Sequence, residues 1–369
     1  MASNNKLVVF NTGAGIGVVA GADSSKIVVG PVFPPTSSES MYGVACDWSE
    51  NCYVCDSANS TIYQVTEGGR IRIVAGTPSG HGYVNGKGTA ARFNHPHGIA
   101  CDKTGNIYVA DSQNNRLRKI DKDANVTTIC GGFNNPQAVA CGPNGEIYVA
   151  DTDNHKVYRI EAHGRKLLLA GSTVGDVSGT VGGTKIKGSA AKFRNPAGIS
   201  CDRTGNVYVS DTLNYKIKKI DPSGWVTLFA GSGAKANILG SSLTAAFVRP
   251  IFNTCTTSGE IYVIDRVGGK NRLKRINQNG TVATVGYIPG TEWMGTVGAL
   301  GVATDPANRL YVVVSPGTDI STYSSSSSNS SSQSETESSP AVTESLADSS
   351  LSSVSSVSSE SSSLSSTER

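Results

Sequence analysis

The chain has 369 residues, 38% of them hydrophobic and 17% charged, with 42 glycines, which indicates a glycine-rich globular protein. No apolar run approaches the ~20 residues of a membrane-spanning helix, which excludes a transmembrane protein. Charge is distributed unevenly along the chain. Residues 316–369 hold seven acidic residues and one arginine, a net −6, and because the whole chain carries +3, residues 1–315 carry +9.

The N-terminus superficially resembles a signal peptide. Its apolar run, residues 7–10, is four residues long, whereas a signal core needs ~7–15. We therefore expect strands at residues 6–11 and 15–21 instead. Without a convincing signal we favour a cytoplasmic protein, with a secreted or cell-surface protein as the alternative.

A unit of four short strand-like segments, called phrases below, repeats through the middle of the chain. Each phrase has about five residues rich in Val, Ile and Tyr, bounded by Gly, Asn or Asp. The second phrase reads Ile-Tyr-Val-Ala-Asp at residues 107–111 and again at 147–151. It ends five times on an aspartate: Asp56, Asp111, Asp151, Asp211 and Asp265. Four strands per ~40 residues is the period of a propeller blade, and the extra length lies in loops 77–92, 172–192 and 232–246.

The two ends of the repeat region each hold half a unit. Residues 298–315 supply the first two strands of a unit, and the N-terminal strands read as its third and fourth. Joined, they make a sixth blade and remove two exposed sheet edges. The sequence therefore predicts an all-β, six-bladed β-propeller over residues 1–318, closed by the N-terminal strands that complete the last blade.

The C-terminal segment, residues 319–369, is predicted to be a disordered, serine-rich acidic tail. Twenty-six serines fall within residues 321–369, and such a segment cannot offset its ordering entropy. Two interpretations stay open: a flexible arm that kinases phosphorylate, or an O-glycosylated stalk.

The repeated phrases resemble the NHL repeat, a family of six-bladed β-propellers. The resemblance rests on the Asn-Pro pairs at 135–136 and 195–196, on Gly-Asn-Ile-Tyr-Val-Ala-Asp at 105–111 and on Asn-Arg-Leu-Arg-Lys-Ile at 115–120. It covers nearly all of residues 6–315. The fifth copy departs most, with Ile251-Phe-Asn-Thr254 in place of a Gly-small-Ala stretch.

The Asp-x-x-Asn phrase recurs in four copies, from Asp56/Asn59 to Asp211/Asn214. It could supply Ca²⁺ ligands, but the glycine and distal glutamate of a calcium loop are absent. We expect these residues to close the turn after the second strand by hydrogen-bonding the local backbone.

Eight cysteines are too few for a disulfide scaffold. Five of them fall at one repeated position, which indicates a small buried side chain: Cys46, Cys101, Cys141, Cys201 and Cys255. Cys52 and Cys55 match C-x-x-C, but side chains three apart on a strand point to opposite faces, so zinc is not expected. Cys46 and Cys52 should instead face each other across a hairpin, as a possible disulfide.

No catalytic set emerges from the motifs. Propeller lyases that resemble this family hold a metal with histidines from several blades, whereas here only the second copy offers histidine and the others have Gln137, Ala197 and Ile251. Phosphate-loop, dinucleotide and nucleophile-elbow patterns all fail. We therefore expect no catalytic residues, no metal and no cofactor, although enzyme activity stays an open question.

The third strands are basic, as in Arg116, Arg118 and Lys119. Together with the +9 charge, they could attract single-stranded RNA, which some NHL propellers of developmental regulators bind on the top face. The opposing interpretation is an ordinary solvated face of the blade.

We therefore expect a non-catalytic, monomeric scaffold that binds a protein partner through one propeller face, which is an inference by analogy. The alternatives are single-stranded RNA binding and a propeller hydrolase or lyase. The expected face consists of the loops before the first strand and between the second and third strands of each blade. It would present His95, His97, Asn114, Asn135, Gln137, Asn154, His155, Arg194, Tyr215 and Arg249.

Overall fold

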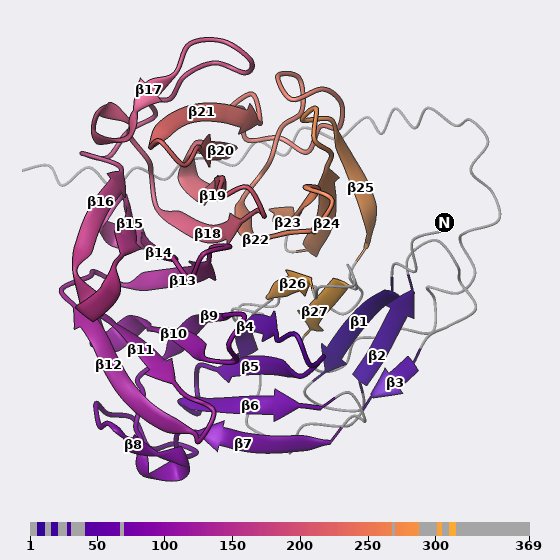
Figure 1. Cartoon of the computed structure of the whole chain (residues 1–369). Coiled ribbons are helices and arrows are strands. Elements are labelled where there is room, and N and C mark those ends of the chain that lie inside the picture. The colour runs from indigo at the N-terminus through magenta and orange to yellow at the C-terminus, as the bar shows by residue number, and fades with distance from the viewer. Residues whose placement is uncertain are drawn as a thin grey trace, which may run out of the picture. The chain divides into compact units, whose positions relative to one another are not determined.

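A computed structural model describes residues 6–11, 16–20, 28–30, 41–66, 70–267, 270–287, 301–304 and 310–314 (Figure 1). These residues form an all-β propeller. Its helical elements are 3-10 turns of three residues each: η1 (Gly88–Ala90), η2 (Ser112–Asn114), η3 (Thr152–Asn154), η4 (Ala162–Gly164), η5 (Gly188–Ala190) and η6 (Thr212–Asn214). No helix in these ranges is long and apolar enough to cross a membrane. The predicted tail, residues 319–369, lies outside the described residues.

Five blades follow the five sequence repeats, each an antiparallel sheet of four strands in chain order. From the innermost strand outward, they are β4 (Met41–Cys46), β5 (Cys52–Asp56), β6 (Thr61–Val65) and β7 (Ile71–Ala75) in blade 1; β9 (Pro96–Cys101), β10 (Ile107–Asp111), β11 (Arg116–Ile120) and β12 (Asn125–Gly131) in blade 2; β13 (Pro136–Cys141), β14 (Ile147–Asp151), β15 (Lys156–Ile160) and β16 (Lys166–Ala170) in blade 3; β18 (Pro196–Cys201), β19 (Val207–Asp211), β20 (Lys216–Ile220) and β21 (Trp225–Ala230) in blade 4; and β22 (Pro250–Cys255), β23 (Ile261–Val267), β24 (Lys270–Ile276) and β25 (Val282–Tyr287) in blade 5. The second strands are buried along their whole length in blades 1 to 4, since both of their faces pack between neighbouring sheets.

The innermost strands contact one another around a central axis (Figure 1). Their close approach requires glycine at particular points. A Cβ at Gly98 of β9 would lie 2.6 Å from the Cα of Ala138 in β13, and one at Gly301 would lie 2.3 Å from the carbonyl oxygen of Tyr42. The second contact is informative because Gly301 immediately precedes β26 (Val302–Thr304). Strand β26 therefore sits between β22 and β4 and completes the ring of innermost strands.

The terminal segments meet in one further sheet, with the order β26–β27–β1–β2–β3. It contains β27 (Leu310–Val314), β1 (Lys6–Asn11), β2 (Ile16–Ala20) and β3 (Val28–Gly30). The expected association of the two ends in one sheet is thus present in the backbone pairing. The six-blade prediction is corrected, however, because the structure shows five blades. The sixth sheet has five strands, and its β27–β1 pair is parallel, with Val9 opposite Val312, whereas the strands within a blade are antiparallel.

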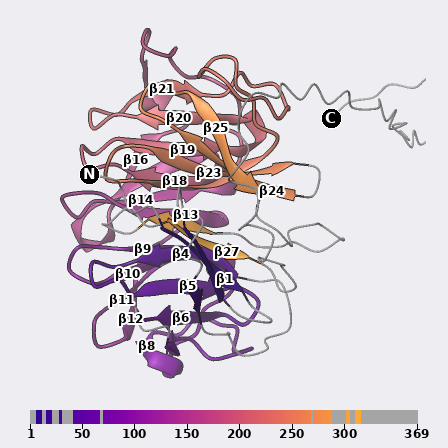
Figure 2. The same cartoon turned by 90° about the vertical axis from the view of Figure 1, so that its right-hand side faces the viewer.

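The inter-blade loops run along the outside of the ring. Short strands β8 (Gly86–Lys87) and β17 (Ile186–Lys187) extend blades 2 and 4 at their outer edges, and β8 lies at the edge in both views (Figure 1, Figure 2). Three of the loops end on a fully buried phenylalanine that packs between blades: Phe93, Phe193 and Phe247.

Two faces follow from this topology. The loop face comprises the segments before the innermost strands and the turns between second and third strands. The turn face comprises the hairpin turns between first and second strands and between third and fourth strands.

Candidate binding face

The aspartate at the end of each second strand organises the loop face. All five of these aspartates are fully buried. One carboxylate oxygen of Asp111 accepts a hydrogen bond from the Asn114 amide at 2.9 Å, and the other accepts the backbone N–H of Asn94 at 2.8 Å. Asp151 and Asp211 repeat the arrangement with their own blades' residues. The Asp-x-x-Asn phrase therefore closes a turn, as expected, but in these three blades it does so through the asparagine side chain and not through the local backbone. The same aspartate also fixes the loop that precedes the innermost strand.

Three basic residues of the third strands are buried beside these aspartates. Arg118 pairs with Asp111 at 2.7 Å and Lys218 with Asp211 at 2.7 Å, and all four side chains are 0% exposed. Lys274 pairs with Asp265 at 2.8 Å in the same way. The expectation that the basic third strands form a solvated or RNA-binding face is therefore wrong for these positions.

The inter-blade loop is what covers each buried cation. The Arg118 guanidinium donates to the carbonyl oxygens of Arg92 and Val84 and lies 5.1 Å from the centre of the Phe93 ring. Lys218 and Lys274 likewise donate to carbonyls of the loop before their own blade and lie 5.0 and 4.7 Å from Phe193 and Phe247. Each ion pair thus ties a loop, a turn and a strand together.

A hydrogen-bonded network joins blades 2, 3 and 4 across the loop face. The Asp153 carboxylate in η3 accepts from the side-chain amides of Asn135 at 3.0 Å and Asn195 at 2.9 Å. The backbone N–H of Asn135 donates to the Asn115 side chain, and that of Asn195 donates to Nδ1 of His155. We call these five residues the Asp153 network. Four of them, all except Asp153, have left-handed backbone with φ between 50° and 58°, a conformation that asparagine tolerates well.

The centre of the loop face is lined by aromatic and basic side chains. The rings of Tyr42 and His97 stack with their centres 4.1 Å apart. Burial, helped by His95, lowers the pKa of His97 to about 4, so this imidazole is neutral at physiological pH. Burial also lowers the pKa of Arg266, and the charge of Arg249 contributes. The backbone N–H of Arg266 donates to the carbonyl of Arg249 at 3.1 Å.

The structure brings the sequence-predicted residues to the loop face in two equivalent sets. One set lies just before or at the start of the innermost strands: His95, His97, Asn135, Gln137, Arg194 and Arg249. The other lies in or just after the short 3-10 turns: Asn114, Asn154, His155 and Tyr215. Arg194 and Arg249 are exposed, while the other eight are partly buried. Their role in binding stays a prediction.

Within the described ranges, no group of three or more His, Cys, Asp or Glu side chains is placed to hold a metal ion. His81 and His95 stack at 5.2 Å, and His95 also contacts the Asn94 side chain.

The cysteines of the repeated position lie toward the turn face, at the ends of the innermost strands. Cys46 and Cys52 are opposite one another in the β4–β5 hairpin and are joined by a disulfide, with Cα atoms 4.0 Å apart. Cys55 is a fully buried free thiol, so Cys52 and Cys55 do not act as a C-x-x-C pair. The four other cysteines of the repeated position line a cavity at the axis, which also touches Cys46. Sequence reasoning recognised the repeat but not this cavity.

The fold and its repeats define the class of protein: a β-propeller built from one recurring four-stranded unit. A model of the NHL repeat family matches residues 93–120 and 133–158. These ranges contain β9, β10 and β11 of blade 2, and β13, β14 and the start of β15 in blade 3. The chain therefore contains NHL repeats in these two blades.

Two curated relatives and two solved structures illustrate the similarity. NHL repeat-containing protein 2 of Gallus gallus is 33% identical over 182 residues, covering 46% of this chain and 19% of that protein. The Homo sapiens protein of the same name is 35% identical over 179 residues, covering 46% and 18%. The chain thus matches about a fifth of the length of these relatives.

Among solved structures, a nidogen/laminin complex has a TM-score of 0.54 at 16% identity, covering 84% of this chain and 98% of that one. A Xanthomonas campestris gluconolactonase has a TM-score of 0.51 at 15% identity, covering 74% and 83%. At these identities the likeness concerns the fold alone.

Proposed function

We propose that this protein is a non-catalytic scaffold that binds a protein partner through the loop face of its propeller. The observation that carries the proposal is the Asp153 network. It fixes polar side chains from three consecutive blades in one surface before any partner arrives. A surface whose side chains are already ordered loses less conformational entropy on association.

The exposed residues around this network suit a protein interface. Arg194 precedes β18 and Arg249 precedes β22, and both are exposed beside a largely hydrogen-bonded surface. Arginine is enriched in protein interfaces and among their energetic hot spots. Single-stranded RNA binding is the alternative, but it loses three of the basic residues that suggested it, because Arg118, Lys218 and Lys274 are buried in ion pairs.

A capture experiment with matched variants tests the proposal. Immobilised wild-type chain is compared with the loop-face variant Arg194→Glu/Arg249→Glu and with the control Lys87→Glu/Lys122→Glu. The control reverses the same amount of charge at exposed residues of the outer edge and turn face of blade 2. Bound proteins are quantified by mass spectrometry after nuclease treatment.

We expect at least one protein that the wild type and the control capture equally and that the loop-face variant captures at least tenfold less. Loss of all specific capture after nuclease treatment would instead favour RNA. Equal capture by all three chains would overturn the proposal that this face binds a protein.

A further inference from the structure

The turn face carries a cavity at the axis of the ring, with a volume of about 620 Å³. The last residue of the innermost strand lines it in blades 2 to 5: Cys101, Cys141, Cys201 and Cys255. Burial raises the pKa of all four thiols, that of Cys255 to about 12, so the floor of the cavity is uncharged at physiological pH. A neutral thiol behaves as a small hydrophobic group. This floor is therefore suited to an apolar side chain.

The rim of the cavity carries an aromatic side chain and two basic ones, in contrast to its thiol-lined floor. Trp48, Lys103 and Arg203 occupy equivalent positions in the hairpin turns that follow the innermost strands of blades 1, 2 and 4. Trp48 is 55% exposed. An exposed tryptophan beside two cations is typical of a surface that covers a ligand, because aromatic residues and arginine are enriched where proteins associate.

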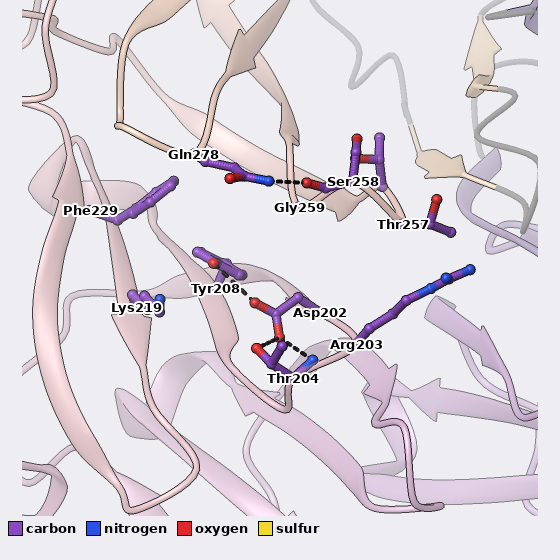
Figure 3. Close-up of a pocket in the computed structure, with 11 residues that line it drawn as sticks. Asp202, Arg203, Thr204, Tyr208, Lys219, Phe229, Thr257, Ser258, Gly259 and Gln278 are labelled. Atoms are coloured by element: carbon purple, nitrogen blue, oxygen red, sulfur yellow. Dashed lines mark hydrogen bonds between the residues drawn. The ribbon is translucent and has the colours of Figure 1, made fainter. Parts of the chain in front are cut away.

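A groove between blades 4 and 5 continues this cavity outward. It has a volume of about 450 Å³ (Figure 3). The two hollows share four lining residues: Asp202, Arg203, Thr256 and Thr257. One wall of the groove contains Tyr208 and Phe229, whose rings meet edge to face at 4.9 Å. Ser258 and Gln278, on the opposite side in Figure 3, are hydrogen-bonded to each other.

The charges along this path favour an anionic ligand. The carboxylate of Asp202 accepts hydrogen bonds from Thr204, Asn206 and Tyr208, at 2.8 to 3.2 Å. Burial alone would raise the pKa of Asp202, but these hydrogen bonds outweigh it and keep the carboxyl ionised. Its oxygens are thus occupied within the turn, and Asp102 is held in the same way.

The cations are differently placed. Lys219 lies 5.7 Å from the centre of the Tyr208 ring, and neither Lys219 nor Arg203 forms an ion pair with any carboxylate in the described part of the chain. Lys103, Arg203 and Lys219 are three cations against two carboxylates, Asp102 and Asp202. The lining residues therefore carry one net positive charge. Lys103 donates to the carbonyl oxygen of Pro143 at 2.8 Å, so Arg203 and Lys219 are the two cations that we assign to a ligand.

We propose that the cavity and the groove together bind a linear peptide segment in which an apolar side chain is followed by acidic residues. The apolar side chain enters the thiol-lined cavity beside Trp48. The acidic residues lie along the groove, between Arg203 and Lys219 and within reach of the hydroxyls of Thr257 and Ser258. Each hollow has the size of a typical ligand pocket. This site lies on the turn face, whereas the protein-binding surface proposed above is the loop face. Each proposal can therefore fail without affecting the other.

Three labelled peptides test this site by fluorescence anisotropy: Ser-Leu-Glu-Glu-Ser, its Leu-Lys-Lys counterpart, and Ser-Ser-Glu-Glu-Ser, which lacks the apolar anchor. We expect only the first to bind, with affinity that falls as salt rises because the acidic residues contact exposed cations. Arg203→Glu/Lys219→Glu should weaken binding at least tenfold. Arg203→Glu alone, at an exposed residue, should weaken it severalfold and guards against misfolding of the double variant.

The controls separate this site from the loop face. Lys87→Glu/Lys122→Glu and Arg194→Glu/Arg249→Glu should bind the first peptide as the wild type does. The bound peptide should also slow alkylation of Cys141 and Cys201 while leaving Cys130, a free thiol of β12 outside the cavity, unaffected. Equal binding of the acidic and basic peptides, or undiminished binding by the Arg203/Lys219 variants, would overturn the proposal.

Discussion

The buried ion pairs explain why basic residues recur in the third strands. Arg118 lies with Asp111 where neither side chain reaches solvent, and its two terminal guanidinium nitrogens also donate to loop carbonyls. Placing charges in such a site is costly unless they are paired and hydrogen-bonded. The pair therefore makes the inter-blade loop, the turn and the strand depend on one another.

Removal of one partner should be strongly destabilising. We expect Arg118→Met to lower the free energy of unfolding by about 3–5 kcal/mol, because it leaves the Asp111 carboxylate buried without a cation. The control is Arg116→Met, two residues away, which loses only a contact with the Tyr83 ring at 4.0 Å and should cost less than about 1 kcal/mol. Urea unfolding of the three chains measures the difference. Similar losses in both variants would contradict the account of the buried pair.

His97 should make stability depend on pH in a predictable direction. The folded chain keeps this imidazole neutral down to about pH 4, whereas its ordinary pKa is 6.5. Between pH 6.5 and pH 4 the unfolded chain binds more protons than the folded chain, so the free energy of unfolding falls as the pH is lowered. This imidazole contributes a loss of about 3 kcal/mol at pH 4. Urea unfolding at pH 7 and pH 4 should show a smaller acid loss in His97→Gln than in the wild type. His163→Asn, at an exposed histidine, should retain the wild-type loss.

At this scale the sequence predicted the Asp-x-x-Asn turns because their partners lie three residues apart, within one turn. It did not predict the burial of Arg118. The loop carbonyl of Val84 that covers it lies 34 residues earlier in the chain, and the local pattern of basic and apolar residues is the same for a solvated strand and a covered one.

The strand elements of the five blades follow directly from repeated local patterns. Strands rich in Val, Ile and Tyr end at Gly, Asn or Asp, and the observed bounds of β10 and β14 coincide with the Ile-Tyr-Val-Ala-Asp phrases. The terminal sheet is different. No short turn connects β27 to β1, because they lie at opposite ends of the described chain. Nothing local therefore forces the antiparallel pairing of a hairpin, and their parallel register could not be inferred from the blade pattern.

Proline substitution should distinguish an interior strand of the terminal sheet from its edge. Val9 of β1 pairs with Gly17 on one side and with Val312 on the other, whereas β3 pairs only with β2. A proline removes a backbone donor and is tolerated mainly at sheet edges. We expect Val9→Pro to lower the free energy of unfolding by roughly 1–3 kcal/mol and Val28→Pro in β3 to lower it less, as measured by thermal and urea unfolding. A larger effect at Val28 would contradict this strand order.

At the scale of the whole molecule, the terminal strands of the described chain close the ring. Strand β26 completes the ring of innermost strands, and β27 pairs with β1. Closure of the ring also defines the two faces, because it places equivalent positions of successive blades side by side on the loop face and on the turn face. The repeat period predicted the propeller fold but not its blade count. The turn-face cavity forms only when cysteines 40 to 60 residues apart converge on one axis.

The thermal stability of two truncated chains tests this closure most directly. Deletion of residues 1–20 removes β1 and β2, so that β27 keeps β26 but loses its second partner strand, and we expect the Tm to fall by roughly 10 °C or more. A chain that ends at residue 315 keeps every described strand, and its Tm should equal that of the full chain. Equal Tm values for the two truncated chains would contradict the closed ring.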